Sequence, residues 1–108
     1  MTRSIFLPVA VLLAATGCEP APVRHVVEIR DLTFGPAVIE VAVGDTILWV
    51  NHDLFPHTST VGGAAGWNTG LIPADSSRTA VARRPGTFNY VCEVHPTMRG
   101  KITVHPLS

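Results

Sequence analysis

The sequence has few cysteines, few methionines and no excess of charge of either sign, and each shortage excludes a class of protein. Its 108 residues include two Cys and two Met, and eight Lys and Arg balance eight Asp and Glu. Two cysteines cannot build a disulfide-dense scaffold. A formal net charge of zero lacks the basic excess that nucleic-acid binding needs, so we expect no nucleic acid among the partners. The length fits one domain and excludes an enzyme built around a cleft between two domains.

The longest apolar run is too short to cross a bilayer. It extends from Ile5 to Ala15, is interrupted by Pro8 and follows the charge of Arg3. A membrane-spanning helix needs about 20 apolar residues, whereas a secretion signal has a shorter apolar core after a basic start. We therefore predict that residues 1–17 are a signal peptide and that the protein is periplasmic or otherwise extracytoplasmic. The alternative, a buried N-terminal helix, is disfavoured by the proline and by the missing polar face.

The segment A-A-T-G-C, which ends at Cys18, resembles a bacterial lipoprotein box. Ala15 occupies the position where such boxes most often have Leu. Lipidation of Cys18 would anchor the domain to a membrane, since each buried CH₂ group contributes about 0.8 kcal/mol. Residues 18–22 would then form the lipidated cysteine and a short, stiff tether. The alternative is cleavage without lipidation, after Ala15 or Gly17, which leaves a free thiol.

From residue 23 onward, short β-branched runs alternate with Gly, Pro, Asn and Asp, a pattern typical of strands and turns. The Gly44–Asp45 pair predicts a hairpin between two of these runs. About seven or eight strands in so short a chain predict an all-β fold, a Greek-key antiparallel β-sandwich or barrel, over residues 23–108. Trp49 and Trp67 are expected to fill its core. The expected strands include 25–30, 38–43, 46–51, 58–61, 79–83, 87–92 and 101–105.

Three candidate metal ligands lie close together near the C-terminus. Phe88, Tyr90 and Cys92 alternate along an expected strand, so all three side chains should face the core. His95 and Met98 follow the cysteine at steps of three residues, close enough for one tight loop to direct all three donors at one point. A thiolate, an imidazole and a thioether together favour copper over harder ions. A thioether is a poor zinc ligand, which disfavours zinc.

A fourth candidate ligand, His57, follows Pro56 at the start of another expected strand. With it the set becomes two imidazoles, a thiolate and a thioether, which matches the trigonal His₂Cys site with a weak axial Met of blue-copper electron-transfer centres. Taken singly, each residue has a structural interpretation as a buried thiol, a surface histidine or a core methionine. The remaining histidines have no soft ligand at a fitting step and are interpreted as structural; they are His25, His52 and His105.

These segments resemble the cupredoxins, the type 1 blue copper proteins, and within them the amicyanin and plastocyanin group. The matching parts are V-G-D-T-I-L-W-V-N-H-D-L-F-P-H and P-G-T-F-N-Y-V-C-E-V-H-P-T-M-R-G-K-I-T-V, and the resemblance covers nearly all of Val23 to Val104. The short C-x₂-H-x₂-M loop has the amicyanin spacing. The resemblance implies one copper ion held by the Cys92 thiolate, the His57 and His95 imidazoles and the axial Met98 thioether.

The resemblance also implies a function. The protein would be a monomer and no enzyme, and it would shuttle single electrons between redox partners such as a c-type cytochrome and a dehydrogenase or oxidase. Electrons would pass through the edge of the His95 ring, within an apolar patch for which the candidates are Leu54, Phe55, Pro56, Pro96 and Thr97. Two alternatives remain open: an extracytoplasmic copper carrier or storage protein with the same ligands, and a copper-independent binding module on the same fold.

One residue departs from the family pattern. Several members have Asn directly after the first ligand histidine, where it helps to tie the two ligand loops together, whereas this sequence has Thr58. We expect the backbone N–H of Thr58 to reach the Cys92 sulfur and its hydroxyl to bond locally. Because hydrogen bonds near the sulfur tune the potential, that potential is not transferable from relatives.

Overall fold

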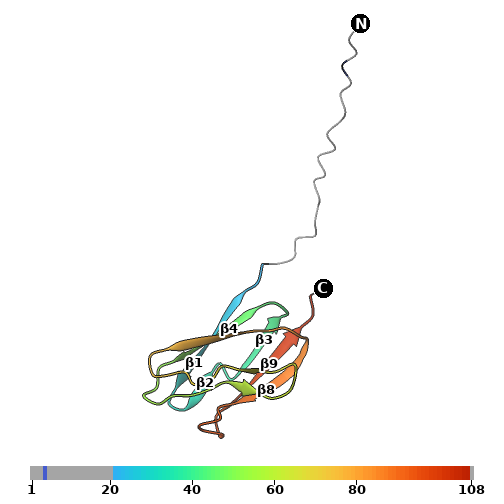
Figure 1. Cartoon of the computed structure of the whole chain (residues 1–108). Helices are drawn as coiled ribbons and strands as arrows, with labels where there is room; N and C mark the ends of the chain where they lie inside the picture. Colours follow the sequence, from blue (N-terminus) through green and yellow to red (C-terminus); the bar gives the residue numbers. More distant parts are fainter. Residues whose placement is uncertain (1–3, 5–20, 108) are drawn as a thin grey trace.

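The computed structural model describes residue 4 and residues 21–107. The predicted signal peptide and Cys18 therefore lie outside the described residues. None of the described residues belongs to a helix that could span a membrane. The described part forms strands joined by turns (Figure 1); the strands are β1 (Arg24–Arg30), β2 (Thr33–Gly35), β3 (Val38–Ala42), β4 (Thr46–Asn51), β5 (Thr60–Val61), β6 (Trp67–Asn68), β7 (Ser77–Val81), β8 (Gly86–Val91) and β9 (Arg99–His105).

The strands form two sheets that pack as a sandwich, which confirms the predicted all-β architecture. One sheet has the order β2-β1-β4-β7 and the other the order β3-β9-β8-β5-β6. Two pairs, β1 with β4 and β3 with β9, are parallel, and the remaining pairs are antiparallel. Each sheet therefore contains one parallel pair and is mixed. The parallel pairs join strands that are distant in the sequence.

The predicted hairpin at Gly44–Asp45 is wrong. β3 pairs with β9 in one sheet, while β4 pairs with β1 and β7 in the other, so this turn carries the chain between the sheets. The buried Asp45 carboxylate holds the crossover, since it accepts hydrogen bonds from the N–H groups of Val23 and Ala42, both at 2.9 Å. A local G-D signal cannot distinguish such a crossover from a hairpin, because the same turn serves both.

Aromatic side chains fill the centre of the sandwich. In β4 the side chains alternate between buried and half-buried, which places Trp49 in the core with no exposed surface. The Tyr90 ring packs edge-on against it with a centroid separation of 5.6 Å, and Phe34 packs against Tyr90 at 4.7 Å. Trp67 is half-buried, 6.1 Å from Trp49. The expectation that both tryptophans serve packing is confirmed, and the rings form a rigid base beneath the loops at one end.

Candidate metal centre

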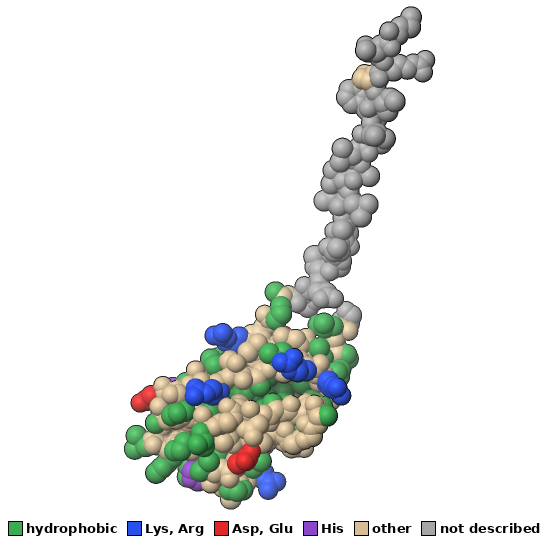
Figure 2. Space-filling view, in the orientation of Figure 1, with side chains coloured by type: hydrophobic (Ala, Val, Ile, Leu, Met, Phe, Trp, Pro, Cys, Tyr) green, Lys and Arg blue, Asp and Glu red, His purple; other side chains and the backbone are tan. Residues whose placement is uncertain are grey.

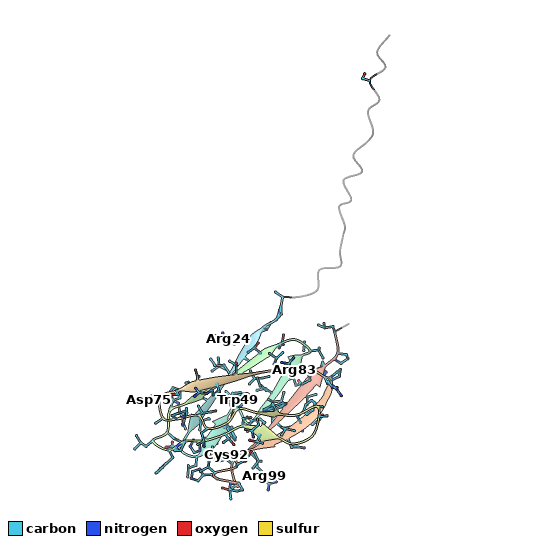
Figure 3. The ribbon with its side chains drawn as sticks, in the orientation of Figure 1. Arg24, Trp49, Asp75, Arg83, Cys92 and Arg99 are labelled. Atoms are coloured by element: carbon cyan, nitrogen blue, oxygen red, sulfur yellow. The ribbon has the colours of Figure 1, made fainter. Side chains whose placement is uncertain are left out.

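Two loops meet at one end of the sandwich. Thr60 of β5 pairs with Val91 of β8, which also pairs with Arg99 of β9, so these strand ends are neighbours. The chain between β4 and β5 and the chain between β8 and β9 consequently lie side by side there. Figure 3 shows Cys92 at this end, on the far side of the molecule from Arg24. Residues 35 positions apart in the sequence, His57 and Cys92, are brought into contact in this way.

A buried asparagine shapes the first loop. The Asn51 side-chain amide donates hydrogen bonds to the carbonyl oxygens of Phe55 at 2.7 Å and Ile72 at 3.0 Å. Its side-chain oxygen accepts the N–H of Asp53 at 2.9 Å. The backbone of His57 also forms a bridge with that of Ile72, through bonds of 3.2 and 2.7 Å. The backbone that carries the histidine is therefore fixed by hydrogen bonds on both sides.

The imidazole of His57 is oriented by a carboxylate. Its Nε2 lies 2.9 Å from Oδ2 of Asp53, and the ring has no exposed surface. Asp53 also accepts the N–H groups of Asp31 at 2.6 Å and Leu32 at 3.0 Å, two consecutive residues with left-handed φ of 50° and 58°. Such a pair of residues forms an anion-binding concavity of backbone N–H groups.

Burial raises the pKa of Asp53, but the hydrogen bonds from Leu32, His57 and Asp31 outweigh it and hold the pKa below its usual value. An ionised carboxylate can only accept, so Nε2 of His57 carries the proton. Nδ1 is then the nitrogen with a free lone pair, and it lies 3.7 Å from the Cys92 sulfur.

The second loop closes on itself. The N–H of Cys92 donates to the carbonyl of Met98 at 3.1 Å, and the N–H of Met98 donates to the carbonyl of His95 at 2.9 Å. Cys92 has no exposed surface, Met98 is 3% exposed, and His95 is half-buried. The three predicted ligands on this segment are therefore held in one tight turn.

The predicted donors converge. One ligand atom from each of His57, Cys92 and His95 lies within 4.8 Å of the others, and this group is the one cluster of its kind found among the described residues. Nδ1 of His95 is buried and has no hydrogen-bond partner within the described part of the chain. A buried nitrogen without a partner is unfavourable unless another group satisfies it, and a metal ion would do so. The donor chemistry, two imidazoles and a thiolate, fits copper.

A protein-family model described as a Cupredoxin-like domain matches residues 3–104 of this chain. The chain belongs to the cupredoxin family. It is 31% identical over 90 residues to the amicyanin of Paracoccus denitrificans, an alignment that covers 80% of this chain and 69% of the relative. The amicyanin of Paracoccus versutus is 26% identical over 83 residues, which cover 73% of this chain and 63% of that protein.

Solved structures agree with this assignment. The Cu(I) form of an amicyanin variant is 27% identical, with a TM-score of 0.72 over 81% of this chain and 87% of that one. A Cu-containing nitrite reductase from Thermus scotoductus is 29% identical, with a TM-score of 0.70, but the match covers 23% of its chain. The family binds copper, and His57, Cys92 and His95, with Met98 beside them, are grouped as in a type 1 copper site.

Thr58 of this cupredoxin links the two loops. Its N–H donates to the Cys92 sulfur at 3.3 Å, as the sequence predicted. Its hydroxyl lies 3.0 Å from the hydroxyl of Thr60 and accepts the N–H of Glu93 at 2.9 Å. The bond to Glu93 was not predicted, and it ties the loops together at the position where several relatives use Asn.

An apolar surface surrounds the half-buried histidine. Leu54 is 87% and Phe55 58% exposed, and the Phe55 ring lies 6.3 Å from that of His95, centroid to centroid. All five predicted patch residues are exposed, and we call them the apolar rim: Leu54, Phe55, Pro56, Pro96 and Thr97. Figure 2 shows hydrophobic side chains gathered beside a histidine at this end. Val94, next to the histidine in sequence, adds to the exposed apolar area and was not predicted.

The other three histidines lie outside the cluster. Each is within hydrogen-bond distance of a carboxylate rather than a sulfur; the pairs are His25 with Asp45, His52 with Glu28 and His105 with Glu40. Asn51 and Asp53 shape the site and were not predicted from the sequence. Their nearness to His57, within six positions, was a signal that they could contribute to the site. Their partners, Ile72 and Leu32, are distant in the sequence, so the contacts themselves could not be predicted.

Proposed function

We propose that this cupredoxin is a small exported blue copper protein that carries single electrons between redox partners. The proposed copper ligands are His57, Cys92, His95 and Met98. The observation that carries the proposal is the convergence of a thiolate and two imidazoles, whose ligand atoms lie within 4.8 Å of one another, together with the buried His95 Nδ1 that has no partner among the described residues. When bound, copper supplies a reversible one-electron change between Cu(I) and Cu(II).

The protein's part is to hold the donors still. Asp53 keeps the lone pair of His57 Nδ1 available, and Thr58 donates to the sulfur. Because these hydrogen bonds fix the His57 and Cys92 side chains, little rearrangement is required when the charge of the site changes. Four donors from the protein leave no strongly binding position for a substrate, which supports a carrier rather than an enzyme.

The apolar rim supports a transient docking site for a redox protein. Its exposed leucine and phenylalanine lie beside His95, the ligand nearest to solvent, so a partner seated there would approach the metal closely. Small interfaces of this kind suit short-lived electron-transfer complexes. The partners we propose are a c-type cytochrome and a dehydrogenase or oxidase, with the electron leaving through the edge of the His95 ring.

The proposal includes the location of the protein. Residues 1–17 would direct export, Cys18 would carry lipid, and residues 18–22 would connect the anchor to the cupredoxin domain of residues 23–108. The carrier would then work as a monomer at a membrane surface outside the cytoplasm, in the periplasm or an equivalent extracytoplasmic space. This part rests on the sequence pattern around Cys18 and on the similarity to amicyanins.

Titration of the apo-protein with Cu(II), followed by visible spectroscopy, tests the proposal. We expect saturation at one equivalent, the intense absorption of a thiolate-bound Cu(II) ion, and reversible bleaching by a reductant. Cys92→Ser should remove that absorption. A site that binds Cu(I) but shows no reversible oxidation would instead identify a copper carrier or storage protein and would contradict the electron-transfer proposal.

The docking surface needs a separate measurement. Stopped-flow oxidation of the reduced protein by a small c-type cytochrome should slow about fivefold or more in Phe55→Ser, since an aromatic anchor at an interface centre typically contributes above about 1 kcal/mol. The control is Val26→Ser, which removes another exposed apolar side chain, on β1 outside the apolar rim. Equal rates for the two variants would show that the apolar rim is not the docking site.

A further inference from the structure

The end of the sandwich opposite to the copper loops carries three arginines. Arg24 begins β1 and Val81 ends β7, and both pair with Thr46 of β4, so they lie about two strand spacings, roughly 10 Å, apart. Arg83 and Arg84 follow directly in the connection to β8. Figure 3 shows Arg24 and Arg83 toward one end of the sandwich, and Cys92 and Arg99 at the other end.

The charges of these three residues are not neutralised within the described part of the chain. Arg24, Arg83 and Arg84 are exposed, and none forms an ion pair with a described residue. Of the acidic residues toward this end, Asp45 is 6% exposed, and its oxygens are occupied by two backbone N–H groups and His25. The exposed Glu40 lies 3.0 Å from His105 and forms no ion pair with an arginine of the described part. We call the three arginines the arginine pole.

Exposed aliphatic side chains accompany the charges. Val23, which precedes Arg24, is 53% exposed, and Leu107 near the C-terminus is 46% exposed; both line one hollow beside Gly44. Arginines interspersed with aliphatic groups match the interface of a phospholipid bilayer, where guanidinium groups bind phosphates and apolar groups reach the acyl boundary. Figure 2 shows Lys and Arg side chains toward this end of the visible face.

We propose that the arginine pole rests on the anionic phospholipid headgroups of the membrane, so that the copper loops face the aqueous side. The inference rests on the proposed lipid anchor at Cys18. The six residues from Cys18 to Arg24 span at most about 20–22 Å when extended. That reach allows Arg24 to come within one Debye length of the headgroups, about 8–10 Å at physiological salt. The anchor would thus keep the arginines close to the headgroups and leave the apolar rim, at the other end, accessible to a partner.

Vesicle binding of the unlipidated protein tests the pole apart from the anchor. The mature chain, residues 18–108 with Cys18→Ser, contains every described strand. It is mixed at low salt with vesicles of phosphatidylglycerol and phosphatidylcholine, and with vesicles of phosphatidylcholine alone. We expect stronger binding to the anionic vesicles and loss of that difference in 0.5 M salt, a concentration whose Debye length is about 4–5 Å. Equal binding to both vesicle types would overturn the proposal.

A matched pair of triple variants locates the binding surface. Arg24→Gln with Arg83→Gln and Arg84→Gln should weaken binding to the anionic vesicles about 100-fold, since each arginine near such a surface strengthens binding about fivefold. The control removes the same charge elsewhere, through Arg30→Gln, Arg78→Gln and Arg99→Gln, and should weaken binding less than about threefold. Equal losses in both variants would show that net charge acts without a defined surface.

The two proposals can fail independently. Mass spectrometry of the protein isolated from the membranes of the producing cell shows whether Cys18 carries lipid. A protein without lipid would remove the anchor, whereas the vesicle experiment would still show whether the pole binds anionic lipid. Circular dichroism and the copper absorption of each variant confirm that a change in binding does not come from loss of the fold.

Discussion

At the scale of single residues, hydrogen bonds decide which lone pairs stay available to a metal. Asp53 occupies Nε2 of His57 and leaves Nδ1 facing the Cys92 sulfur. Thr58 gives its N–H to the same sulfur and accepts the N–H of Glu93 with its hydroxyl. Neither polar residue is a proposed ligand, yet each holds a ligand in place, and groups of this kind commonly tune affinity and potential.

Asp53→Asn should weaken copper binding about 10- to 100-fold, the usual cost of losing such an outer partner. The amide NH₂ cannot accept the N–H groups that Asp53 now receives, and the lost negative charge should also raise the reduction potential. Competitive Cu(II) titration and voltammetry measure these effects, and ¹⁵N NMR of the apo-protein reports the His57 tautomer. Asp75→Asn is the control, because Asp75 is exposed and Asn tolerates its φ of 58°. Equal shifts in both variants would contradict the orienting role.

Thr58→Val should lower the free energy of unfolding by about 1–3 kcal/mol. Valine has nearly the same shape but leaves the N–H of Glu93 without its acceptor, while the backbone bond to the Cys92 sulfur is kept. Urea denaturation of the apo-protein measures the change. Thr58→Ser restores the hydroxyl and should recover most of the stability; a serine variant as unstable as the valine variant would argue against the hydroxyl contact.

At the scale of the strands, close packing between β8 and β9 sets the base of the copper loop. Tyr90 of β8 lies opposite Gly100 of β9 in the ladder, and its ring covers the glycine. Burial raises the pKa of Tyr90 to about 12, so the ring remains neutral in the core. A side chain at position 100 would displace this ring, two residues from Met98.

Gly100→Ala should therefore destabilise the fold by about 1–3 kcal/mol, the range typical of overpacking. An added Cβ would overlap the ring carbons and the hydroxyl of Tyr90. Thermal unfolding of the apo-protein measures the loss. The control is Gly62→Ala, at an exposed position where an added Cβ has nothing within 4 Å. If both variants unfold at the same temperature, the Tyr90 packing is less tight than the structure indicates.

At the scale of the whole molecule, the two ends of the sandwich carry different groups. One end holds the copper donors and the apolar rim, and the other holds the arginine pole and the crossover at Asp45. Burial raises the pKa of Asp45, but the N–H groups of Val23 and Ala42 and the His25 contact outweigh it and hold the pKa below its usual value. The ionised carboxylate therefore stabilises the crossover between the sheets.

The stability supplied by Asp45 should depend on pH. The pKa of Asp45 is lower in the folded protein than in the unfolded chain, so at a pH between these two values the unfolded chain binds more protons. The stability that Asp45 supplies is therefore full above about pH 4 and is lost as the pH falls further. Asp45→Asn should be less stable than wild type at pH 7, with a smaller difference at pH 3. Urea denaturation of the apo-proteins measures both differences.

The control for this experiment is Glu40→Gln, which removes an exposed carboxylate and should change stability by less than about 0.5 kcal/mol. The pH argument is wrong if the gap between wild type and Asp45→Asn is the same at pH 7 and pH 3. Other groups titrate in both proteins, so the comparison isolates Asp45.

Much of the site could be predicted because its signals are local. The steps from Cys92 to His95 and Met98 lie within one short loop, and the alternation of Phe88, Tyr90 and Cys92 correctly predicted a buried sulfur. The roles of Asn51 and Asp53 could not be predicted, because their partners lie about twenty residues away and are met only after the sheets form.

The sequence by itself determined that short strands pack as a sandwich and which donor types its loops carry, because period and spacing are properties of neighbouring residues. Only the tertiary structure decided that His57 meets Cys92 and that the turn at Asp45 joins different sheets. It also decided that Arg24 and Arg83 share the end opposite the copper loops. The physical reason is that contacts between distant residues depend on the pairing of strands, which no local pattern encodes.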